Sequence, residues 1–197
     1  MIGARPTHWI TQARRFPGAR EAVAAVEFAL VMPLLLMLYL GSLELSQLIN
    51  IDQRVTNIAG TVGDLVSRTN GTIPAATLTD YFKAATAIIS PFPTTGLTQV
   101  VTLVKVDATT SVATVVWSQA YNGGTAKIVN SVYGPAALPT AITSISKGSY
   151  VVVSEANYPY LPLLGLFFKS TFNLYHQNFY APRYASKICY VTPDPCT

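Results

Sequence analysis

Residues Val23 to Leu43 read VAAVEFALVMPLLLMLYLGSL, an apolar run in which Glu27 is the only charged side chain. A helix needs about 20 apolar residues to cross the hydrocarbon core of a bilayer, and this run has that length. The whole chain of 197 residues leaves room for one modest domain after such a helix. The sequence therefore predicts a single-pass membrane protein whose remaining part folds outside the bilayer.

The charges on either side of the apolar run predict its orientation. Four arginines and no acid occupy the first part of the chain: Arg5, Arg14, Arg15 and Arg20. Because basic residues stay on the cytoplasmic side, we expect residues 1–22 to form a cytoplasmic leader and the chain after about residue 45 to be exported. No clear small-residue cleavage site follows the run, which favours an uncleaved anchor over a secretory signal peptide. From Glu21 onward the charges cancel, so the net charge of +4 belongs to the leader and nucleic-acid binding is not expected.

Glu27 is out of character within the apolar run. A carboxylate near the centre of the hydrocarbon core is unfavourable by about 3 kcal/mol unless it reaches water or a partner. Glu27 therefore either lies near the cytoplasmic interface and reaches back to water, or pairs with a positive group inside the membrane. Pro33 removes one helical hydrogen bond, and we expect a bend there.

The helical pattern continues beyond the apolar run. Six apolar residues recur at alternating steps of three and four: Leu48, Ile51, Val55, Ile58, Val62 and Leu65. This heptad pattern predicts one continuous helix over residues 23–68, which Asn70-Gly71 ends. The stripe either packs on the chain's own domain or packs against another subunit. Gly60 and Gly63 would allow another element to approach the helix closely.

The remaining residues, 69–197, predict an α+β domain. Apolar residues between Leu78 and Ile89 mark a short amphipathic helix that Ser90-Pro91 ends. Segments rich in valine, threonine and aromatic residues then predict four strands, at residues 99–106, 112–117, 150–158 and 170–180. A turn over residues 107–111 joins the first two strands into a hairpin. The expected fold is a long N-terminal helix packed on a small antiparallel sheet.

The string from Ala22 onward, AVAAVEFALVMP, resembles the start of the TadE/TadG-like proteins, which are pseudopilins or minor pilins of tight-adherence type IV pilus systems. The shared features are an arginine-rich leader, a small residue, four further residues, and then Glu27-Phe28 at the start of an apolar helix. The family implies cleavage by a prepilin peptidase, here between Ala22 and Val23, which makes Glu27 the fifth residue of the mature chain. The family usually has glycine where this chain has Ala22.

The resemblance also implies a location and partners. The chain would lie in the bacterial inner membrane as a single-pass protein, with its N-terminus in the cytoplasm and its C-terminal domain in the periplasm. Its expected partners are other pilin or pseudopilin subunits, prepilin peptidase, the inner-membrane pilus assembly platform and membrane lipid. Inside the apolar bundle of an assembly, Glu27 would pair with the N-terminal amine of a neighbouring subunit, since neither charge is stable there alone.

Two features near the C-terminus leave alternatives open. Residues 158–168, YPYLPLLGLFF, carry no charge and form either a buried loop and helix or an exposed apolar patch that touches membrane or a partner subunit. The only cysteines, Cys189 and Cys196, are close in sequence, and in an oxidising compartment we expect them to form a disulfide. Free thiols or a link to another chain are the alternatives.

Residues that would make an enzyme are not grouped in the sequence. The two histidines are His8 in the leader and His176 in a predicted strand, and no phosphate-binding, zinc or nucleophile motif occurs. We therefore expect no catalysis, no metal and no cofactor. The leading hypothesis is a minor pilin that assembles through its N-terminal helix. A membrane-anchored extracytoplasmic binding module outside any filament is the alternative, and a tethered enzyme is the least favoured.

Overall fold

The computed structural model describes residues 20–134, 138–162, 165 and 168–191. The chain divides into two compact units, Met1–Ser46 and Gln47–Thr197. One helix, α2 (Arg20–Ser67), belongs to both units. We call its residues 23–46 the anchor segment and its residues 47–67 the packing segment. The predicted long helix is confirmed, but it begins at Arg20, so its backbone is helical on both sides of the predicted cleavage site. The predicted division into leader, helix and exported domain refers to a membrane and stays a prediction.

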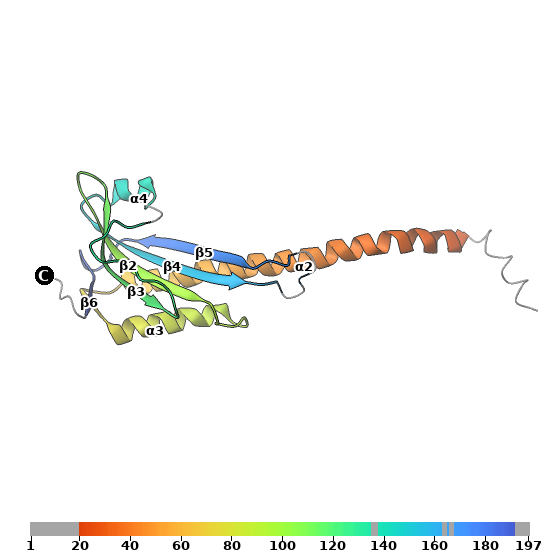
Figure 1. Cartoon of the computed structure of the whole chain (residues 1–197), viewed down its shortest axis with the longest axis horizontal. Coiled ribbons are helices and arrows are strands. Elements are labelled where there is room, and N and C mark those ends of the chain that lie inside the picture. The colour runs from red at the N-terminus through yellow and green to blue at the C-terminus, as the bar shows by residue number, and fades with distance from the viewer. Residues whose placement is uncertain (1–19, 135–137, 163–164, 166–167, 192–197) are drawn as a thin grey trace, which may run out of the picture. The chain divides into compact units, whose positions relative to one another are not determined.

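The C-terminal unit, Gln47–Thr197, contains the other described elements (Figure 1). In chain order they are β1 (Thr72–Pro74), α3 (Ala75–Thr86), the 3-10 helix η2 (Ala87–Ile89), β2 (Thr98–Val106), β3 (Ala113–Tyr121), α4 (Thr140–Ile145), β4 (Tyr150–Tyr160), β5 (Phe172–Tyr180) and β6 (Cys189–Val191). The short amphipathic helix predicted before Ser90 is α3 followed by η2, and the four predicted strands are β2 to β5.

Strands β2 to β5 form one antiparallel sheet in the order β3-β2-β4-β5. The predicted hairpin is the β2–β3 pair, and the Asp107 carboxylate closes its turn by accepting backbone N–H bonds from Thr109 and Thr110 at 2.8 and 2.7 Å. These bonds hold the pKa of Asp107 below its usual value. β3 continues past the predicted end to Tyr121, because its second half pairs with the start of β2 at Gln99.

One face of the sheet packs against α3 and the packing segment of α2. Successive residues of a strand point to opposite faces, so every second residue of β2, β4 and β5 faces these helices. Both helices contribute their apolar sides to a single core. Its fully buried members include Ile51, Val55, Ile58, Leu97, Leu103 and Val152. The structure thus confirms a mixed α+β fold in which the long helix packs on a four-stranded sheet.

A second, smaller core lies on the opposite face of the sheet. The strands contribute Val104, Val115, Val151 and Val153, and the segment between β3 and β4 covers them with Tyr133, Leu138 and Ile142 of α4. Because both faces of β4 are covered, six consecutive residues of this strand are buried, Val151 to Ala156. The sequence did not predict α4, whose six residues TAITSI are too few to show a helical period.

A small parallel sheet of β1 and β6, also not predicted, joins the C-terminal part of the chain to the end of α2. Thr72 pairs with Cys189, and the Cys189 N–H donates to the Gly71 carbonyl oxygen at 2.8 Å. The Trp117 indole N–H donates to the Ile188 carbonyl oxygen at 2.8 Å, which fixes the same segment against the main sheet. Strands of three residues carry no readable sequence alternation, so only the tertiary structure reveals them.

Candidate functional site

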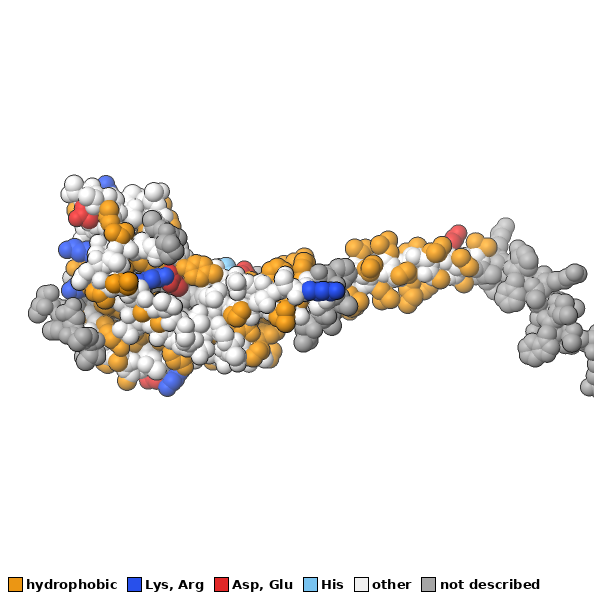
Figure 2. Space-filling view, viewed as in Figure 1, with side chains coloured by type: hydrophobic (Ala, Val, Ile, Leu, Met, Phe, Trp, Pro, Cys, Tyr) orange, Lys and Arg blue, Asp and Glu red, His pale blue; other side chains and the backbone are white. Residues whose placement is uncertain are grey.

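The anchor segment presents apolar side chains on the face that Figure 2 shows in orange, and every side chain from Val23 to Tyr39 is exposed. Val23, Phe28 and Leu30 are 59%, 62% and 74% exposed. Among the described residues, one helix is long and apolar enough to cross a membrane, and the chain buries none of its most apolar window. This result is consistent with the predicted single-pass anchor, because such a surface is stable only against lipid or other apolar helices.

Glu27 lies within this apolar surface and is exposed. Its neighbours one helical turn away are Val23, Leu30 and Val31, and none of them carries a charge. The predicted cleavage site precedes it, but the side chain of Ala22 lies outside what the structure describes. The roles of Ala22 and Val23 in processing, and of Glu27 and Phe28 in assembly, stay predictions.

The heptad stripe of the packing segment lies in the core of the chain's own C-terminal unit. Ile51, Val55, Ile58 and Val62 are at most 1% exposed, whereas Leu48 and Leu65 are half-buried. The buried surface also includes Ala59 and Val66, which a strict heptad pattern misses. The stripe is therefore wider than a coiled-coil seam, as expected for a helix that packs on a sheet. Its buried members have no free surface for another subunit.

A row of polar contacts joins the packing segment to β5; we call it the α2–β5 seam. Three bonds define it: His176 Nε2 lies 2.6 Å from Asp52 Oδ1, Asn178 Nδ2 donates to the Thr56 carbonyl oxygen at 3.2 Å, and Arg183 Nη2 donates to Asp64 Oδ1 at 2.6 Å. Asp52 and Thr56 are one helical turn apart, and His176 and Asn178 are two residues apart on β5, so the two periods match there. Arg183 follows the end of β5 and extends the row to Asp64. The sequence showed the alternation around His176 but gave no sign of its partner on α2.

Tyr180 lies directly over the helix between two glycines. A Cβ atom added to Gly63 would lie 2.5 Å from the Cε2 atom of the Tyr180 ring, closer than real contacts allow. A Cβ on Gly60 would lie 3.5 Å from the Tyr180 hydroxyl oxygen, an ordinary contact. The predicted close approach of another element to the helix is thus confirmed at Gly63. Burial, followed by the Asp64 charge, raises the pKa of Tyr180.

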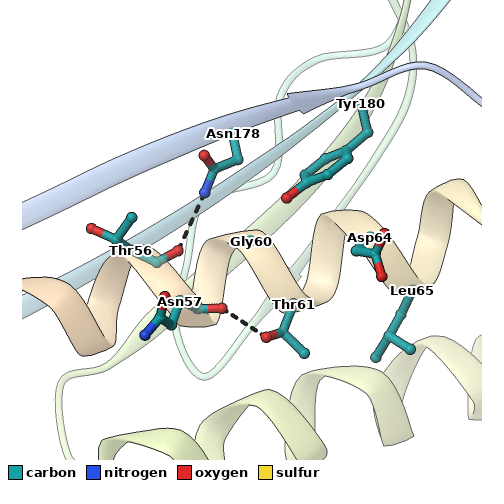
Figure 3. Close-up of a pocket in the computed structure, with 8 residues that line it drawn as sticks. All are labelled: Thr56, Asn57, Gly60, Thr61, Asp64, Leu65, Asn178 and Tyr180. Atoms are coloured by element: carbon teal, nitrogen blue, oxygen red, sulfur yellow. Dashed lines mark hydrogen bonds between the residues drawn. The ribbon is translucent and has the colours of Figure 1, made fainter.

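A polar groove of about 510 Å³ runs along the seam (Figure 3). Asn178 and Tyr180 point from β5 toward Gly60 in the floor of the groove, and the other lining residues come from α2: Thr56, Asn57, Thr61, Asp64 and Leu65. The only carboxylate in it, that of Asp64, is paired with Arg68 at 2.7 Å and Arg183 at 2.6 Å. The groove therefore offers hydrogen bonds, but its described residues do not bring a nucleophile and a free base together.

Glu155 is a buried carboxylate of the C-terminal unit with three bonded partners. It is 6% exposed on the sheet face opposite α2, and it accepts hydrogen bonds from the Tyr133 and Tyr175 hydroxyls at 2.5 and 3.0 Å. Lys127 Nζ lies 3.1 Å from its other oxygen. Burial and the neighbouring carboxylate raise the pKa of Tyr133 and Tyr175. A buried charge with three partners ties the β3–β4 connection to the sheet, which is a structural role.

Residues 158–168 combine both alternatives that the sequence left open. Tyr158 and Tyr160 are 4% and 5% exposed and belong to the main core. Leu161 and Phe168 are 59% and 36% exposed. Residues 163–164 and 166–167 lie outside the described residues. The segment therefore begins in the core and then reaches the surface.

Neither the histidines nor the cysteines form a metal centre in the part of the chain that the structure describes. His176 is bound to Asp52, and no group of three metal-ligating side chains occurs among the described residues. His8 lies outside these residues. Cys189 is disulfide-bonded at the start of β6, whereas Cys196 lies outside the described residues, so the pairing of the two stays a prediction.

The fold and the anchor define a class of protein: an α+β unit on a long helix whose first half could span a membrane. Residues 22–62 match the sequence model of a family described as TadE-like protein. The matched residues include the string from Ala22 onward, and the match therefore confirms the resemblance found in the sequence. No curated protein and no solved structure matches the chain.

Proposed function

We propose that this protein is a membrane-anchored pseudopilin or minor pilin that takes part in assembly of a tight-adherence type IV pilus and joins other subunits through the anchor segment. The observation that carries the proposal is the overlap of two features. The TadE-like match covers residues 22–62, and within it the chain leaves every side chain from Val23 to Tyr39 exposed. A helix of this kind needs partners of its own kind or lipid around it.

Cleavage between Ala22 and Val23 supplies the partner for Glu27. The new N-terminal amine lies four residues from Glu27, about 6 Å along the helix axis. When helices pack laterally, Glu27 of an incoming subunit pairs with the amine of its neighbour, and Phe28 packs beside the pair. Two opposite charges satisfy each other in an apolar bundle where each alone would be unfavourable, so one axial register is preferred over the others.

The packing segment supports this division of roles. The central residues of its apolar stripe, Ile51, Val55 and Ile58, are fully buried inside the C-terminal unit and are not available to another subunit. A coiled coil between subunits through the same stripe would require this core to open. Lateral assembly is therefore assigned to the anchor segment, and the C-terminal unit is carried along as a preformed body.

The proposed orientation is supported by the charges of the leader, and the proposed compartment and partners by the TadE-like match. The arginines before the anchor favour a cytoplasmic N-terminus, and with the match they support a periplasmic C-terminal unit in a bacterial cell. The proposed partners are other pilin subunits, a prepilin peptidase that removes the leader, and the inner-membrane assembly platform. The role is structural and not catalytic: Glu155 is neutralised by Lys127, and His176 is bound to Asp52.

Replacement of Glu27 by glutamine tests the proposal. Glu27→Gln keeps the shape of the side chain and removes its charge, so membrane insertion and leader removal should persist while piliation and surface adherence are lost. Asp80→Asn is the matched control, since Asp80 is exposed on α3 and the same chemical change there should leave piliation intact. Normal piliation by Glu27→Gln would contradict assembly through this pair and would favour the membrane-anchored binding module.

Intact-mass measurement of the protein from its native host tests the processing step. The expected mature chain begins at Val23. Ala22→Gly restores the residue that the family usually has before the cut, so it should increase the processed fraction. A mature protein that retains Met1 in the presence of the peptidase would overturn the cleavage proposal.

A further inference from the structure

The end of the C-terminal unit next to Gln47 carries a group of apolar and aromatic side chains. Its members come from the connection between η2 and β2, and from the β4–β5 connection with the strand residues that border it. Both connections lie at the same end of the sheet (Figure 1). We call this group the basal patch: Phe92, Pro93, Tyr160, Leu161, Phe168 and Phe172.

Short contacts connect the patch to the packing segment of α2. The Tyr160 hydroxyl lies 3.5 Å from Gln47 Oε1. Phe172 is opposite Tyr160 in the β4–β5 register, and the Phe168 ring stacks edge-on against Phe172 with a centroid distance of 5.5 Å. The patch is therefore held at the level of Gln47.

The second connection is held at the same level. A cavity of about 340 Å³ is lined jointly by Gln47, Phe92, Pro93 and Leu161. Arg54 of α2 fixes the start of the η2–β2 connection, because its guanidinium donates to the Ile88 and Ser90 carbonyl oxygens at 2.8 and 2.5 Å. The two connections thus form one surface and not two independent loops.

Gln47 lies close to the end of the apolar run. It follows Leu43 by four residues within α2, which corresponds to about 6 Å along the helix axis. The headgroup region of a bilayer is of similar thickness, roughly 5–7 Å on each side of the hydrocarbon core. A helix that spans the membrane with residues 23–43 therefore places Gln47, and the side chains bound to it, at headgroup depth.

The composition of the patch suits that depth. Phenylalanine and leucine side chains of interfacial proteins bury about 5–10 Å into the boundary between headgroups and acyl chains. Leu161 is 59% exposed and Phe168 is 36% exposed, although both are large apolar residues. Residues 90–97 and 158–172 contain no acid, and their single charge is the basic Lys169. A basic residue among apolar ones is complementary to anionic lipid headgroups.

We propose that the basal patch is a lipid-binding surface that lies on the outer leaflet of the membrane crossed by the anchor segment. Leu161 and Phe168 enter the interface, the buried Tyr160 supports them from the core, and Lys169 faces the anionic headgroups. The surface fixes the height and tilt of the C-terminal unit while the chain is in the membrane. The inference rests on the anchoring part of the proposed function and is independent of pilus assembly.

Lipid-dependent quenching of a fluorophore tests the proposal on the full chain. Single cysteines at Leu161→Cys and, in a second variant, Phe168→Cys carry a bimane label, and the protein is reconstituted in vesicles of phosphatidylcholine and phosphatidylglycerol. In one vesicle preparation a fraction of the lipid bears a nitroxide at the headgroup, and in a second preparation the nitroxide is near the end of the acyl chain. The unsubstituted chain measures any labelling of Cys189 and Cys196.

Two further positions separate the possible results. Ile145→Cys is the water-exposed reference: Ile145 is 80% exposed on α4, which packs beside Val151, about 30 Å along β4 from Tyr160. Leu34→Cys reports the anchor itself and is read with the acyl-chain nitroxide, because Leu34 lies at the middle of residues 23–43; the other positions are read with the headgroup nitroxide. We expect at least about twofold stronger quenching at both Leu161 and Phe168 than at Ile145, as interfacial residues require.

Each result decides one statement. Strong quenching at Leu34 with equal, weak quenching at Leu161, Phe168 and Ile145 would overturn the lipid-binding surface and leave the anchor standing. No quenching at Leu34 would overturn the membrane-spanning part of the proposed function itself. Self-quenching between labels at Leu161 without lipid quenching would show that a second copy covers the patch, which also overturns the proposal.

Discussion

The two halves of α2 are equally continuous as helix but place their apolar side chains in opposite ways. In the anchor segment, Leu30, Leu34 and Leu38 are 74%, 59% and 65% exposed. In the packing segment, Ile51, Val55 and Ile58 are fully buried. One helix thus has an apolar surface that the described part of the chain leaves exposed, followed by an apolar stripe whose central residues the chain buries.

The difference shows what determines the role of an apolar residue in a helix. The anchor segment lacks a polar face, so no orientation on a sheet could hide all its side chains, and a membrane or other apolar helices must solvate them. The packing segment has a polar face, which carries Asp52, Thr56 and Asp64 in the α2–β5 seam. Its stability therefore depends on contacts within the chain, whereas that of the anchor segment depends on its surroundings.

The largest expected effect comes from truncating one apolar residue in each half. Ile58→Ala should lower the free energy of unfolding of the C-terminal unit by about 2–5 kcal/mol, because it leaves a cavity in a closed core. Leu34→Ala should change it by less than about 0.5 kcal/mol, because Leu34 belongs to the other compact unit and is 59% exposed. Denaturant unfolding of the full chain in detergent, followed by the fluorescence of the buried Trp117 in a Trp9→Phe background, measures both. Equal losses would mean that the two halves form one cooperative unit.

Two glycines of the packing segment are expected to give the next largest changes in the stability of the C-terminal unit. Gly63→Ala should destabilise the C-terminal unit by about 1–3 kcal/mol, because its Cβ would collide with the Tyr180 ring. Gly60→Ala has room for its Cβ, and the better helix propensity of alanine should stabilise by up to about 1 kcal/mol. The same unfolding measurement applies. A stabilising Gly63→Ala would show that β5 can move away from the helix at no loss.

The stability of the C-terminal unit should also depend on Tyr133, which lies on the sheet face opposite α2. Burial raises the pKa of Tyr133, so the folded unit keeps this proton after the unfolded chain begins to lose it, near about pH 10. The stabilisation that the protonated Tyr133 gives the folded unit is fully present below that pH, and the free energy of unfolding falls as the pH rises above it.

Tyr133→Phe should remove part of this alkaline loss. At neutral pH it should destabilise by about 1 kcal/mol, because the bond to Glu155 is gone. Above about pH 10 the stability of the variant should fall less steeply than that of the parent chain. Tyr39→Phe, the same change in the anchor segment, should leave the slope unchanged. An unaltered slope in Tyr133→Phe would assign the alkaline sensitivity to other tyrosines.

The sequence predicted the elements that carry their own periodicity. The apolar run, the stripe from Ile51 to Val62 and the four long strands each repeat a pattern over several turns or residues, and all of them are present. β1, β6 and α4 were missed, since three to six residues are too few for a pattern and their order comes from long-range contacts such as the Trp117–Ile188 bond. The α2–β5 seam was missed for a related reason. His176 and Asp52 are 124 residues apart, and a pairing across that separation has no local signal.

The smallest effect concerns the polar contacts of the seam, and it decides what holds β5 against the packing segment. The side chains of His176 and Asp52 are 30% and 42% exposed, so water and salt screen their attraction even at 2.6 Å. A double-mutant cycle of Asp52→Asn and His176→Gln should therefore give a coupling free energy below about 1 kcal/mol that shrinks with added salt. Such a value, set beside the loss in Ile58→Ala, would mean that the apolar stripe supplies the stability and that the polar row only selects which residues of β5 face α2. A coupling of several kcal/mol, insensitive to salt, would contradict this ranking. The packing segment would then be held mainly by its polar face, and its contrast with the anchor segment would not rest on apolar burial.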